Sequence, residues 1–351
     1  MNTILITGGA GYIGIHTSLI LLEKGFNLVL VDSFSNSSKK SIERLAKITK
    51  SNNKFNNYNF EFFEGDVRDI NFLRNVFEKS KLSGNLISTV IHFAGLKSVA
   101  ESISNPNLYW DVNVYGTVQL LKIMNEYECK NLVFSSSATV YSPQEKSPLY
   151  EDFATKPIDP YGKTKLTVEN ILKNYSDVQQ DNLNIVSLRY FNPIGAHPSG
   201  EIGEYTFKVP NNLFPYICDV AISKRDVLNI FGNDWPTEDG TCVRDFIHIM
   251  DLAEGHLDAI AYLCSNESCY ESINLGSGKG YSVFQIISEF ELSTGCQIPF
   301  SIQSRRDGDL GICYADISKA KILLGWHPKR SLKEICLDGW NWQRKNPSGY
   351  T

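Results

Sequence analysis

The 351-residue chain lacks features that would assign it to several broad classes of protein. It has no apolar run approaching the roughly 20 residues that span a bilayer, so we expect no membrane partner. It has no excess of basic residues, and its net charge of −5 and pI near 5.8 argue against nucleic-acid binding. Any anionic ligand must therefore be held by locally placed Arg, Lys and backbone N–H groups.

Disulfide motifs and metal-ligand spacings are also missing. None of the eight cysteines precedes Cys129 and none forms a Cys-x-x-Cys pair, so we expect reduced thiols in a reducing compartment. The histidines show no metal-ligand spacing, and no metal is expected. The first residues already have the pattern of a core strand, which leaves no room for a signal peptide. We therefore expect a cytoplasmic protein.

The chain does have a glycine-rich turn near its start, Thr7-Gly-Gly-Ala-Gly-Tyr-Ile-Gly14, between a predicted strand and a predicted helix. In this context Gly8 allows a sharp turn, Gly11 allows backbone to approach a phosphate, and Gly14 allows the helix to pack closely on the strand. The N–H groups at the start of the helix then face the anion. A purely structural turn is the alternative, because a glycine pattern alone is weak evidence.

Carboxylates follow the next two predicted strands. Asp32 ends the second strand, 18 residues after Gly14, where an acidic residue would hydrogen-bond an adenosine ribose. A carboxylate there also repels a 2′-phosphate, which favours NAD over NADP; the alternative is a solvated loop Asp. Asp66 follows the third strand, where it would meet the adenine edge with Val67 on its face.

Strand and helix patterns alternate about every 30 residues as far as Tyr190, which predicts a doubly wound parallel sheet of the Rossmann type. Beyond this point prolines and glycines interrupt the pattern. We therefore predict an NAD-binding domain at 1–190 and a smaller α/β lobe at 191–351, with a segment near 241–262 crossing back. The predicted strands are 3–7, 26–32, 60–64, 86–93, 131–135 and 184–188, and the principal helices are 12–24, 107–128 and 160–174.

A tyrosine and a lysine lie one turn apart on the same face of a predicted helix. Asp159-Pro160 caps and starts this helix, so Tyr161 and Lys165 are neighbours. An ammonium within about 6 Å, together with a positive nicotinamide, would lower the phenol pKa from its usual 10. Ser137, after the fifth strand, is placed to share the proton on a substrate oxygen. Tyr-x-x-x-Lys alone can be structural; with this Ser and the glycine turn it predicts redox chemistry.

These motifs resemble the extended short-chain dehydrogenase/reductase superfamily and, in their longer stretches, the UDP-glucose 4-epimerase family. The resemblance runs from about residue 2 to about residue 350. Its segments are Thr7–Gly14, His92–Lys97, Ser135–Tyr141, Arg189–His197, Asn211–Leu213, Phe231 to Asp245, and Arg305–Asp309.

The resemblance implies reversible C4 epimerisation of UDP-glucose and UDP-galactose, a step of galactose metabolism. Tyr161 would take the proton of the sugar 4-hydroxyl while the hydride leaves C4 for the nicotinamide. The 4-keto sugar would turn over in the site and take the hydride back on its other face. NAD must stay bound throughout, since release of NADH would strand a ketone. The resemblance also implies a homodimer formed through the helices near 107–128 and 160–174.

The resemblance also assigns residues to the two ligands. Arg244 and Arg306 would hold the diphosphate, Asn229 and Phe231 the uracil, and Asp309 the ribose. The full set for the UDP-sugar is Ser137, Tyr161, Asn192, Asn212, Leu213, Asn229, Phe231, Arg244, Arg306, Asp309 and Cys313. The set for NAD is Gly8, Gly11, Tyr12, Ile13, Gly14, Asp32, Asn36, Asp66, Val67, Phe93, Ala94, Gly95, Lys97, Asn113, Ser135, Tyr161, Lys165 and Tyr190.

Two positions bear on substrate and on reaction type. Cys313 stands where the resembling family has either a bulky Tyr or a small residue, so we expect a wider pocket that also accepts N-acetylated UDP-sugars. It can instead be a buried filler. His248 looks catalytic, but the family uses its segment for interdomain structure.

Three other functions remain open on this fold. A nucleotide-sugar dehydratase needs an acid pair after the Ser, and Ser137-Ala-Thr-Val140 contains no carboxylate. A decarboxylase or reductase is not excluded by the sequence. A non-catalytic NAD-sensing regulator would have no reason to keep Ser137, Tyr161 and Lys165 together.

Overall fold

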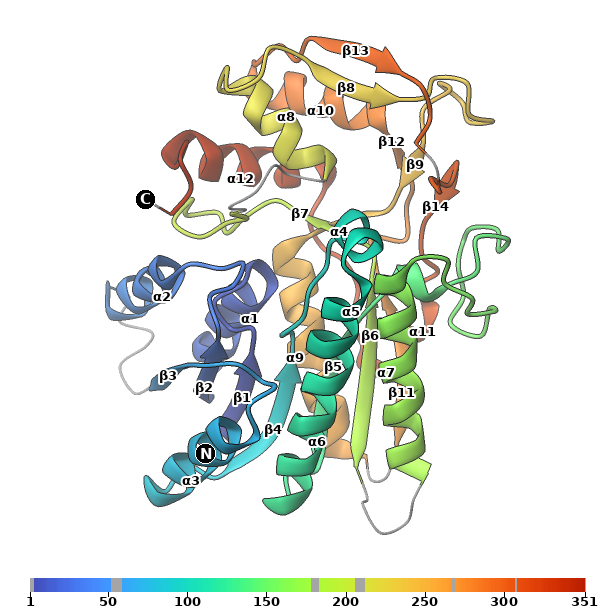
Figure 1. Ribbon diagram of the computed structural model, residues 1–351. Helices are drawn as coiled ribbons and strands as arrows, with labels where there is room; N and C mark the ends of the chain where they lie inside the picture. The colour runs from blue at the N-terminus through green and yellow to red at the C-terminus, as the bar shows by residue number, and fades with distance from the viewer. Residues whose placement is uncertain are drawn as a thin grey trace.

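The computed structural model describes residues 3–51, 59–177, 183–205, 212–266, 269–306 and 308–350. Its largest element is a seven-stranded, all-parallel sheet in the order β11-β6-β5-β4-β1-β2-β3 (Figure 1). The strand order reverses between β1 and β4, as in doubly wound folds, and confirms the predicted fold class. The strands are β1 (Thr3–Thr7), β2 (Asn27–Asp32), β3 (Phe60–Glu64), β4 (Ile87–His92), β5 (Asn131–Ser137), β6 (Asn184–Tyr190) and β11 (Tyr270–Leu275).

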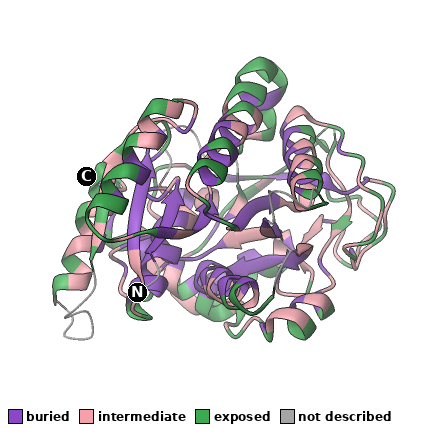
Figure 2. Ribbon diagram, turned by 90° about the horizontal axis from the view of Figure 1, so that it is seen from below, coloured by how far each residue is buried: buried purple, intermediate pink, exposed green. Residues whose placement is uncertain are grey.

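Helices cover both faces of this sheet because alternate strand residues point to opposite sides. In β1, Ile4 and Ile6 join one apolar cluster, whereas Leu5 joins the other. Figure 2 shows the strands as buried and the outer helix faces as exposed. The first cluster includes residues of α1 (Tyr12–Glu23), α2 (Lys39–Ser51), α9 (Ile249–Ser265) and α11 (Ser318–Leu324), and the second of α3 (Ile70–Leu82), α6 (Gly116–Glu126) and α7 (Pro160–Asp177).

The seventh strand was not predicted from the sequence. β11 carries the polar residues Glu271, Ser272 and Asn274, so it lacks the continuous apolar run of the buried strands. It pairs with β6, and α9, which precedes it, packs against α1. The sheet thus takes one strand from beyond residue 190, while the division of the chain into domains at that residue stays a prediction.

The predicted helix at 107–128 needs a correction. A short helix, α4 (Val99–Ser104), precedes α5 (Pro106–Tyr109), which continues through the π-helical turn η2 (Trp110–Tyr115) into α6. A π turn shifts the residues that follow it around the helix, and the apolar pattern does not reveal such a shift. The turn buries Asn113, a residue predicted to contact the cofactor.

The second lobe lies above the large sheet in Figure 1 and has its own apolar core, formed by α8, α10, α12 and short strands. Ser282 and Ser331 start α10 and α12 with capping boxes. Within the described ranges, no helix is long and apolar enough to cross a membrane. The remaining elements are η3 (Ala138–Val140), β7 (Asn192–Ile194), α8 (Leu213–Ala221), β8 (Leu228–Phe231), β9 (Val243–Arg244), β10 (Phe246–His248), β12 (Tyr281–Ser282), α10 (Val283–Thr294), β13 (Phe300–Gln303), β14 (Ile312–Cys313) and α12 (Leu332–Lys345).

Candidate active site

The glycine-rich turn joins the carboxyl end of β1 to α1. Gly8 has a φ of +70°, which glycine tolerates, and a Cβ there would lie 2.8 Å from the backbone N of Ala94. A Cβ on Gly14 would lie 2.3 Å from the carbonyl oxygen of Gly8. The structure therefore has the sharp turn and the close packing predicted for these two residues. α1 begins after Gly11, and no side chain caps its first N–H groups there, which suits an anionic ligand.

Asp32 closes β2 beside this turn. Its carboxylate accepts hydrogen bonds from the backbone N–H of Ala10 at 3.0 Å and from the Ser37 hydroxyl at 2.7 Å. Burial raises the pKa of this carboxyl, and these hydrogen bonds act in the opposite direction. Asn36, on the same loop, is exposed. The position of Asp32 next to the glycine turn is the one required for a ribose contact, which itself stays a prediction.

Asp66 follows β3 and is engaged by a neighbouring arginine. Arg68 donates to both carboxylate oxygens of Asp66, at 2.6 Å for the shortest contact, and also pairs with Asp111 at 2.5 Å. The hydrogen bond from Arg68 lowers the pKa of Asp66. Val67 is buried, and a Cβ on Gly116 would lie 3.0 Å from its side chain. The contact between Arg68 and Asp66 was not predicted from the sequence, where no role was assigned to Arg68.

The loop after β4 is held by the buried amide of Asn113. Its Oδ1 accepts from the backbone N–H of Leu96 at 2.8 Å, and its Nδ2 donates to Leu96 O at 3.1 Å and to Thr164 Oγ1 at 3.1 Å. A Cβ on Gly95 would lie 3.0 Å from Asn113 Oδ1. Asn113 thus fixes the Phe93–Lys97 loop against α7. Lys97 is exposed and pairs with Glu204 of the second lobe at 3.2 Å.

Tyr161, Lys165 and Ser137 come together at the carboxyl end of β5. The side chain of Asp159 accepts from the backbone N–H of Gly162 at 2.8 Å, as expected of the residue that starts α7. Lys165 Nζ lies 5.9 Å from the centre of the Tyr161 ring and donates to the carbonyl oxygen of Ser135 at 2.7 Å. All three predicted catalytic residues therefore occupy one site.

Burial is the main influence on the pKa values of Tyr161 and Lys165. Burial raises the pKa of Tyr161 to about 12, and a hydrogen bond with Ser137 offsets only part of that rise. Burial also lowers the pKa of Lys165 to about 8, while the charge of Glu169 opposes the change. The expectation that Lys165 and a positive nicotinamide lower the pKa of Tyr161 stays a prediction.

Tyr190 ends β6 directly beside Ser137, because these two residues are partners in the β5–β6 register. Its hydroxyl is 2.5 Å from Nε2 of His256, whose ring also packs 4.8 Å from that of Phe93. Burial lowers the pKa of His256 to about 4, so this ring is neutral at pH 7. No sequence pattern indicated a role for His256, which comes from α9 and contacts two predicted cofactor residues.

A cluster of predicted substrate residues lies in the second lobe. Arg306 Nε is 3.0 Å from Asp309, and its guanidinium lies 4.6 Å from the centre of the Phe231 ring. Arg244 Nη2 is 3.8 Å from the other Asp309 oxygen. Four residues from three separate segments therefore converge, and two of them are the arginines assigned to a diphosphate.

The other predicted substrate residues have defined places around this cluster. Asn229 lies two residues before Phe231 in β8, on the same strand face, and accepts from Ser301 Oγ at 2.9 Å. Asn192 starts β7, and Asn212 is the exposed residue that precedes Leu213 and α8. Asn211 lies outside the described residues.

Cys313 is the register partner of Arg244 in the β14–β9 pair. It is partly buried, and burial raises the pKa of its thiol to about 11. The neighbouring Asp245 was not predicted: its buried carboxylate accepts from the backbone N–H groups of Ser277 at 2.6 Å and Ala315 at 3.1 Å. Asp245 thus joins β9 to the segment that follows β14. Its only sequence signal was its place beside Arg244 in the resembling motif.

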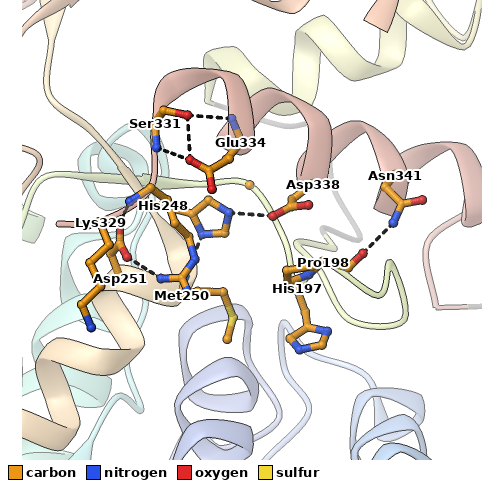
Figure 3. A network of polar contacts seen from close by, with 12 residues as sticks. His197, Pro198, His248, Met250, Asp251, Lys329, Ser331, Glu334, Asp338 and Asn341 are labelled. Atoms are coloured by element: carbon orange, nitrogen blue, oxygen red, sulfur yellow. Dashed lines mark hydrogen bonds and ion pairs between the residues drawn. The ribbon is translucent and has the colours of Figure 1, made fainter. Parts of the chain in front are cut away.

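His248 lies at the junction between the lobes and not with the catalytic group. Its Nδ1 accepts from the backbone N–H of Met250 at 3.0 Å, and its Nε2 is 3.2 Å from Asp338 of α12 (Figure 3). His92 is also a buried structural residue, bonded to Thr7 at 2.6 Å and Thr117 at 2.9 Å. Among the described residues, no group of His, Cys, Asp or Glu side chains has the arrangement of a metal site.

Comparisons with known proteins agree with this geometry. A family model described as GDP-mannose 4,6 dehydratase matches residues 5–338. UDP-glucose 4-epimerase of Bacillus subtilis (strain 168) is 46% identical over 347 residues, covering 99% of this chain and 98% of that protein. The bifunctional UDP-glucose 4-epimerase and UDP-xylose 4-epimerase 1 of Pisum sativum is 45% identical over 349 residues, covering 99% and 97%.

Solved structures give the same result. The UDP-glucose 4-epimerase of Stenotrophomonas maltophila, crystallised with NAD and formylated UDP-arabinopyranose, has a TM-score of 0.92 at 41% identity and covers 99% of both chains. The Bifidobacterium longum enzyme, in complex with NAD+ and UDP, has a TM-score of 0.90 at 42% identity, covering 99% of this chain and all of that one. This chain has the Tyr161–Lys165–Ser137 group, and it is 46% identical to a UDP-glucose 4-epimerase over 99% of its length. It therefore belongs to the UDP-glucose 4-epimerase family.

Proposed function

We propose that this protein interconverts UDP-glucose and UDP-galactose by epimerisation at C4, with NAD as a resident cofactor. One observation carries the proposal. Tyr161 lies beside Lys165 and close enough to Ser137 for that side chain to lower its pKa, next to the point where the strand order of the sheet reverses. In open α/β sheets, ligands bind at the carboxyl ends of the strands near such a reversal. The relatives named UDP-glucose 4-epimerase support the choice of reaction.

The residues present fit NAD. The turn at Gly8–Gly14 has no space for side chains at Gly8 or Gly14, and the start of α1 offers N–H groups without a side-chain cap. Asp32 places a carboxylate beside this turn. This carboxylate could accept a hydrogen bond from a ribose hydroxyl, and it would repel a 2′-phosphate. When bound, NAD would supply reversible hydride acceptance at C4. Two structural relatives were crystallised with NAD, which supports this choice.

Tyr161 would act as the base for the sugar 4-hydroxyl. Its phenol is protonated at neutral pH in the protein alone, because burial raises its pKa. Positive charge brought close to the ring would favour the phenolate, and Lys165 is already anchored nearby by Ser135. Ser137 would share the proton on the substrate oxygen and return it when the sugar presents its other face.

The second lobe would hold the nucleotide while the sugar turns. Arg244 and Arg306 supply two guanidinium groups, suited to a diphosphate, and Phe231 supplies an aromatic face. A bound diphosphate would compete with Asp309 for both arginines, which would free that carboxylate to accept from a ribose hydroxyl. Tight binding at the nucleotide and loose binding at the sugar are what epimerisation requires.

An assay without added cofactor tests the proposal. Purified protein should convert UDP-galactose to UDP-glucose with no added NAD and no net NADH, and denaturation should release NAD. Stoichiometric NADH would instead identify an oxidoreductase, and no turnover by protein with confirmed NAD would identify a regulator. A dehydratase would give a 4-keto-6-deoxy sugar; the residues Ser137–Val140 offer no carboxylate for that elimination.

We also propose that the site accepts N-acetylated UDP-sugars. Cys313 adjoins Arg244, and its side chain is much smaller than the Tyr found in part of the family. The smaller side chain would leave room for an acetamido group at C2.

A homodimer is the assembly we propose, through α5, η2, α6 and α7. Leu108, Trp110 and Tyr115 of this region are exposed, with Tyr115 half exposed at 50%. Exposed large apolar side chains are typical of subunit contacts where they form one patch. Sedimentation equilibrium would give twice the chain mass of 39.5 kDa for a dimer and the chain mass for a monomer.

A further inference from the structure

A buried ion pair lies beneath the catalytic group. Glu169 of α7 and Arg189 of β6 are almost fully buried, and Arg189 Nη2 is 2.7 Å from Glu169 Oε2. Arg189 Nε also donates to Glu169 Oε1 at 3.0 Å, which makes the contact bidentate. A buried pair of this kind gains little stability over an apolar pair of the same shape, because both charges lose their hydration. Stability alone therefore does not explain why this ion pair lies next to the reaction site.

The pair joins the three elements that form the catalytic site. Ser136 of β5 and Arg189 of β6 are register partners, and Ser136 Oγ donates to Glu169 at 2.5 Å. The next register pair along the same strands is Ser137 with Tyr190, both predicted site residues. Successive strand residues point to opposite faces, so Ser136 and Arg189 point towards α7 and the adjacent pair points to the other face. Glu169 therefore binds the register pair directly before the pair of predicted site residues.

Glu169 also lies on the catalytic face of α7. It follows Lys165 by four residues and Tyr161 by eight, so the three side chains lie on one side of the helix, one turn apart. The contacts of Glu169 with Ser136 and Arg189 fix the position of α7 along the direction of the strands. That position sets the distance between Tyr161 and Ser137, and it allows Lys165 to reach the carbonyl oxygen of Ser135.

We propose that Glu169, held by Arg189, is a positioning residue that keeps Lys165 charged and Tyr161 aligned with Ser137. This inference rests on the proposed function, because its consequence is a phenolate at Tyr161 during epimerisation. Arg189 is itself fixed from behind, since its Nη1 donates to Tyr141 Oη at 3.1 Å and to the Glu151 carbonyl oxygen at 3.0 Å.

Among the groups around Lys165, Glu169 is the carboxylate that stabilises the charged form of this lysine. His92 of β4 faces Lys165 but is neutral, because burial and that ammonium lower its pKa to about 3. Tyr161 on the same helix is protonated, and Ser135 of β5 contributes a carbonyl dipole. Glu169 is the charge that raises the pKa of Lys165 against burial, which lowers it to about 8. Arg189 pairs with Glu169, so its positive charge partly offsets the negative charge that acts on Lys165.

The pH profile of kcat tests the proposal with Glu169→Gln, which keeps the shape and removes the charge. Lys165 should lose its proton at lower pH. The alkaline limb of the profile, which reports the loss of that ammonium, should therefore move inward by about one unit, which lowers kcat by about tenfold on that limb. The double variant Glu169→Gln with Arg189→Met removes the unpaired guanidinium, and its alkaline limb should move back towards the wild type.

Asp251→Asn is the matched control. Asp251 is also a buried carboxylate paired with an arginine, Arg330, but it lies at the lobe junction (Figure 3). This variant should lower the Tm while leaving both limbs in place. If the alkaline limb of Glu169→Gln coincides with that of the wild type, whatever the value of kcat, the pair is only structural and the proposal is wrong.

A direct titration separates this inference from the proposed function. The Cε resonance of Lys165 in ¹³C-lysine protein, assigned by its loss in Lys165→Met, reports the lysine charge without any turnover. It should titrate at lower pH in Glu169→Gln than in the wild type, and equal titration would overturn the inference. Absence of epimerisation by the wild type would overturn the proposed function alone.

Discussion

Lys165 donates a hydrogen bond of 2.7 Å to the carbonyl oxygen of Ser135, across the gap between α7 and β5. This contact holds the ammonium 5.9 Å from the centre of the Tyr161 ring. The side chain of a lysine on an exposed helix face would adopt many rotamers, so its charge would have no fixed position. Here the charge is fixed by the strand that also supplies Ser137, so the three groups keep one geometry before any ligand binds.

Replacing Tyr161 with Phe removes the hydroxyl that would act as the base. We expect kcat to fall by about 10²- to 10⁴-fold, because general acid–base catalysis contributes on that order. The Kd for UDP, measured by calorimetry, should stay within about twofold, since Arg244 and Arg306 lie in the other lobe. A matching loss of UDP affinity would show that Tyr161 is a structural residue.

Replacing Cys313 with Tyr should narrow the sugar pocket. The ratio of kcat/KM for UDP-N-acetylglucosamine to that for UDP-glucose should fall by at least about tenfold, because an acetamido group would meet the new ring. Cys264→Tyr is a matched control, since Cys264 is exposed on α9. If Cys313→Tyr keeps full activity towards the N-acetylated sugar, the proposed role of Cys313 is wrong.

Acid should destabilise the fold through its buried neutral histidines. Burial lowers the pKa of His16 and of His92 to about 3, and that of His256 to about 4. As the pH falls below about 6.5 the unfolded chain binds these protons first, so stability is lost between about pH 6.5 and 3. Each histidine contributes a slope of about 1.4 kcal/mol per pH unit in that window.

Urea unfolding between pH 4.5 and 7.5 measures this slope. His92→Gln retains groups that can bond Thr7 and Thr117 but removes one titrating site, so its slope should be smaller by one proton. An unchanged slope in that variant would mean that His92 does not titrate on unfolding.

Arg44 of α2 ties that helix to the end of the chain. Its guanidinium lies 5.3 Å from the ring centre of Trp342 and 5.1 Å from that of Tyr350. It also donates to Glu201 O at 2.9 Å and to Asn346 Oδ1 at 2.6 Å. Arg44→Ala should therefore lower the free energy of unfolding by about 1–3 kcal/mol, through lost cation–π contacts and unpaired acceptors.

Arg74→Ala provides the comparison for Arg44. Arg74 makes a bidentate contact with Glu126, but on the solvent-exposed surface of α3 and α6. Exposed pairs of this kind contribute little. A Tm loss in Arg44→Ala no larger than that in Arg74→Ala would contradict the proposed tie.

Local sequence patterns were sufficient to predict the elements whose signals lie within them or within a few residues of them. The apolar runs before Gly8 and before Asp32 predict strands because buried parallel strands have few polar residues. Asp159-Pro160 predicts the start of α7 because a cap and a first-turn proline act within a few residues. The π turn at Asn113 was not predicted because a shifted helix register hardly changes the apolar pattern. The edge strand β11 was not predicted because its polar residues interrupt the apolar run.

The amino-acid sequence is sufficient to predict the glycine turn, the acidic residue that ends β2, and the spacing of Tyr161 and Lys165. Each is a short-range relation of backbone geometry. The tertiary structure alone decided which distant groups surround them: His256 on Tyr190, Asp245 beneath β14, and Glu169 with Arg189 next to the predicted site residues. It also decided how deeply Tyr161 is buried, and this burial raises the pKa of its phenol. Burial is set by the whole fold, so a short motif does not reveal it.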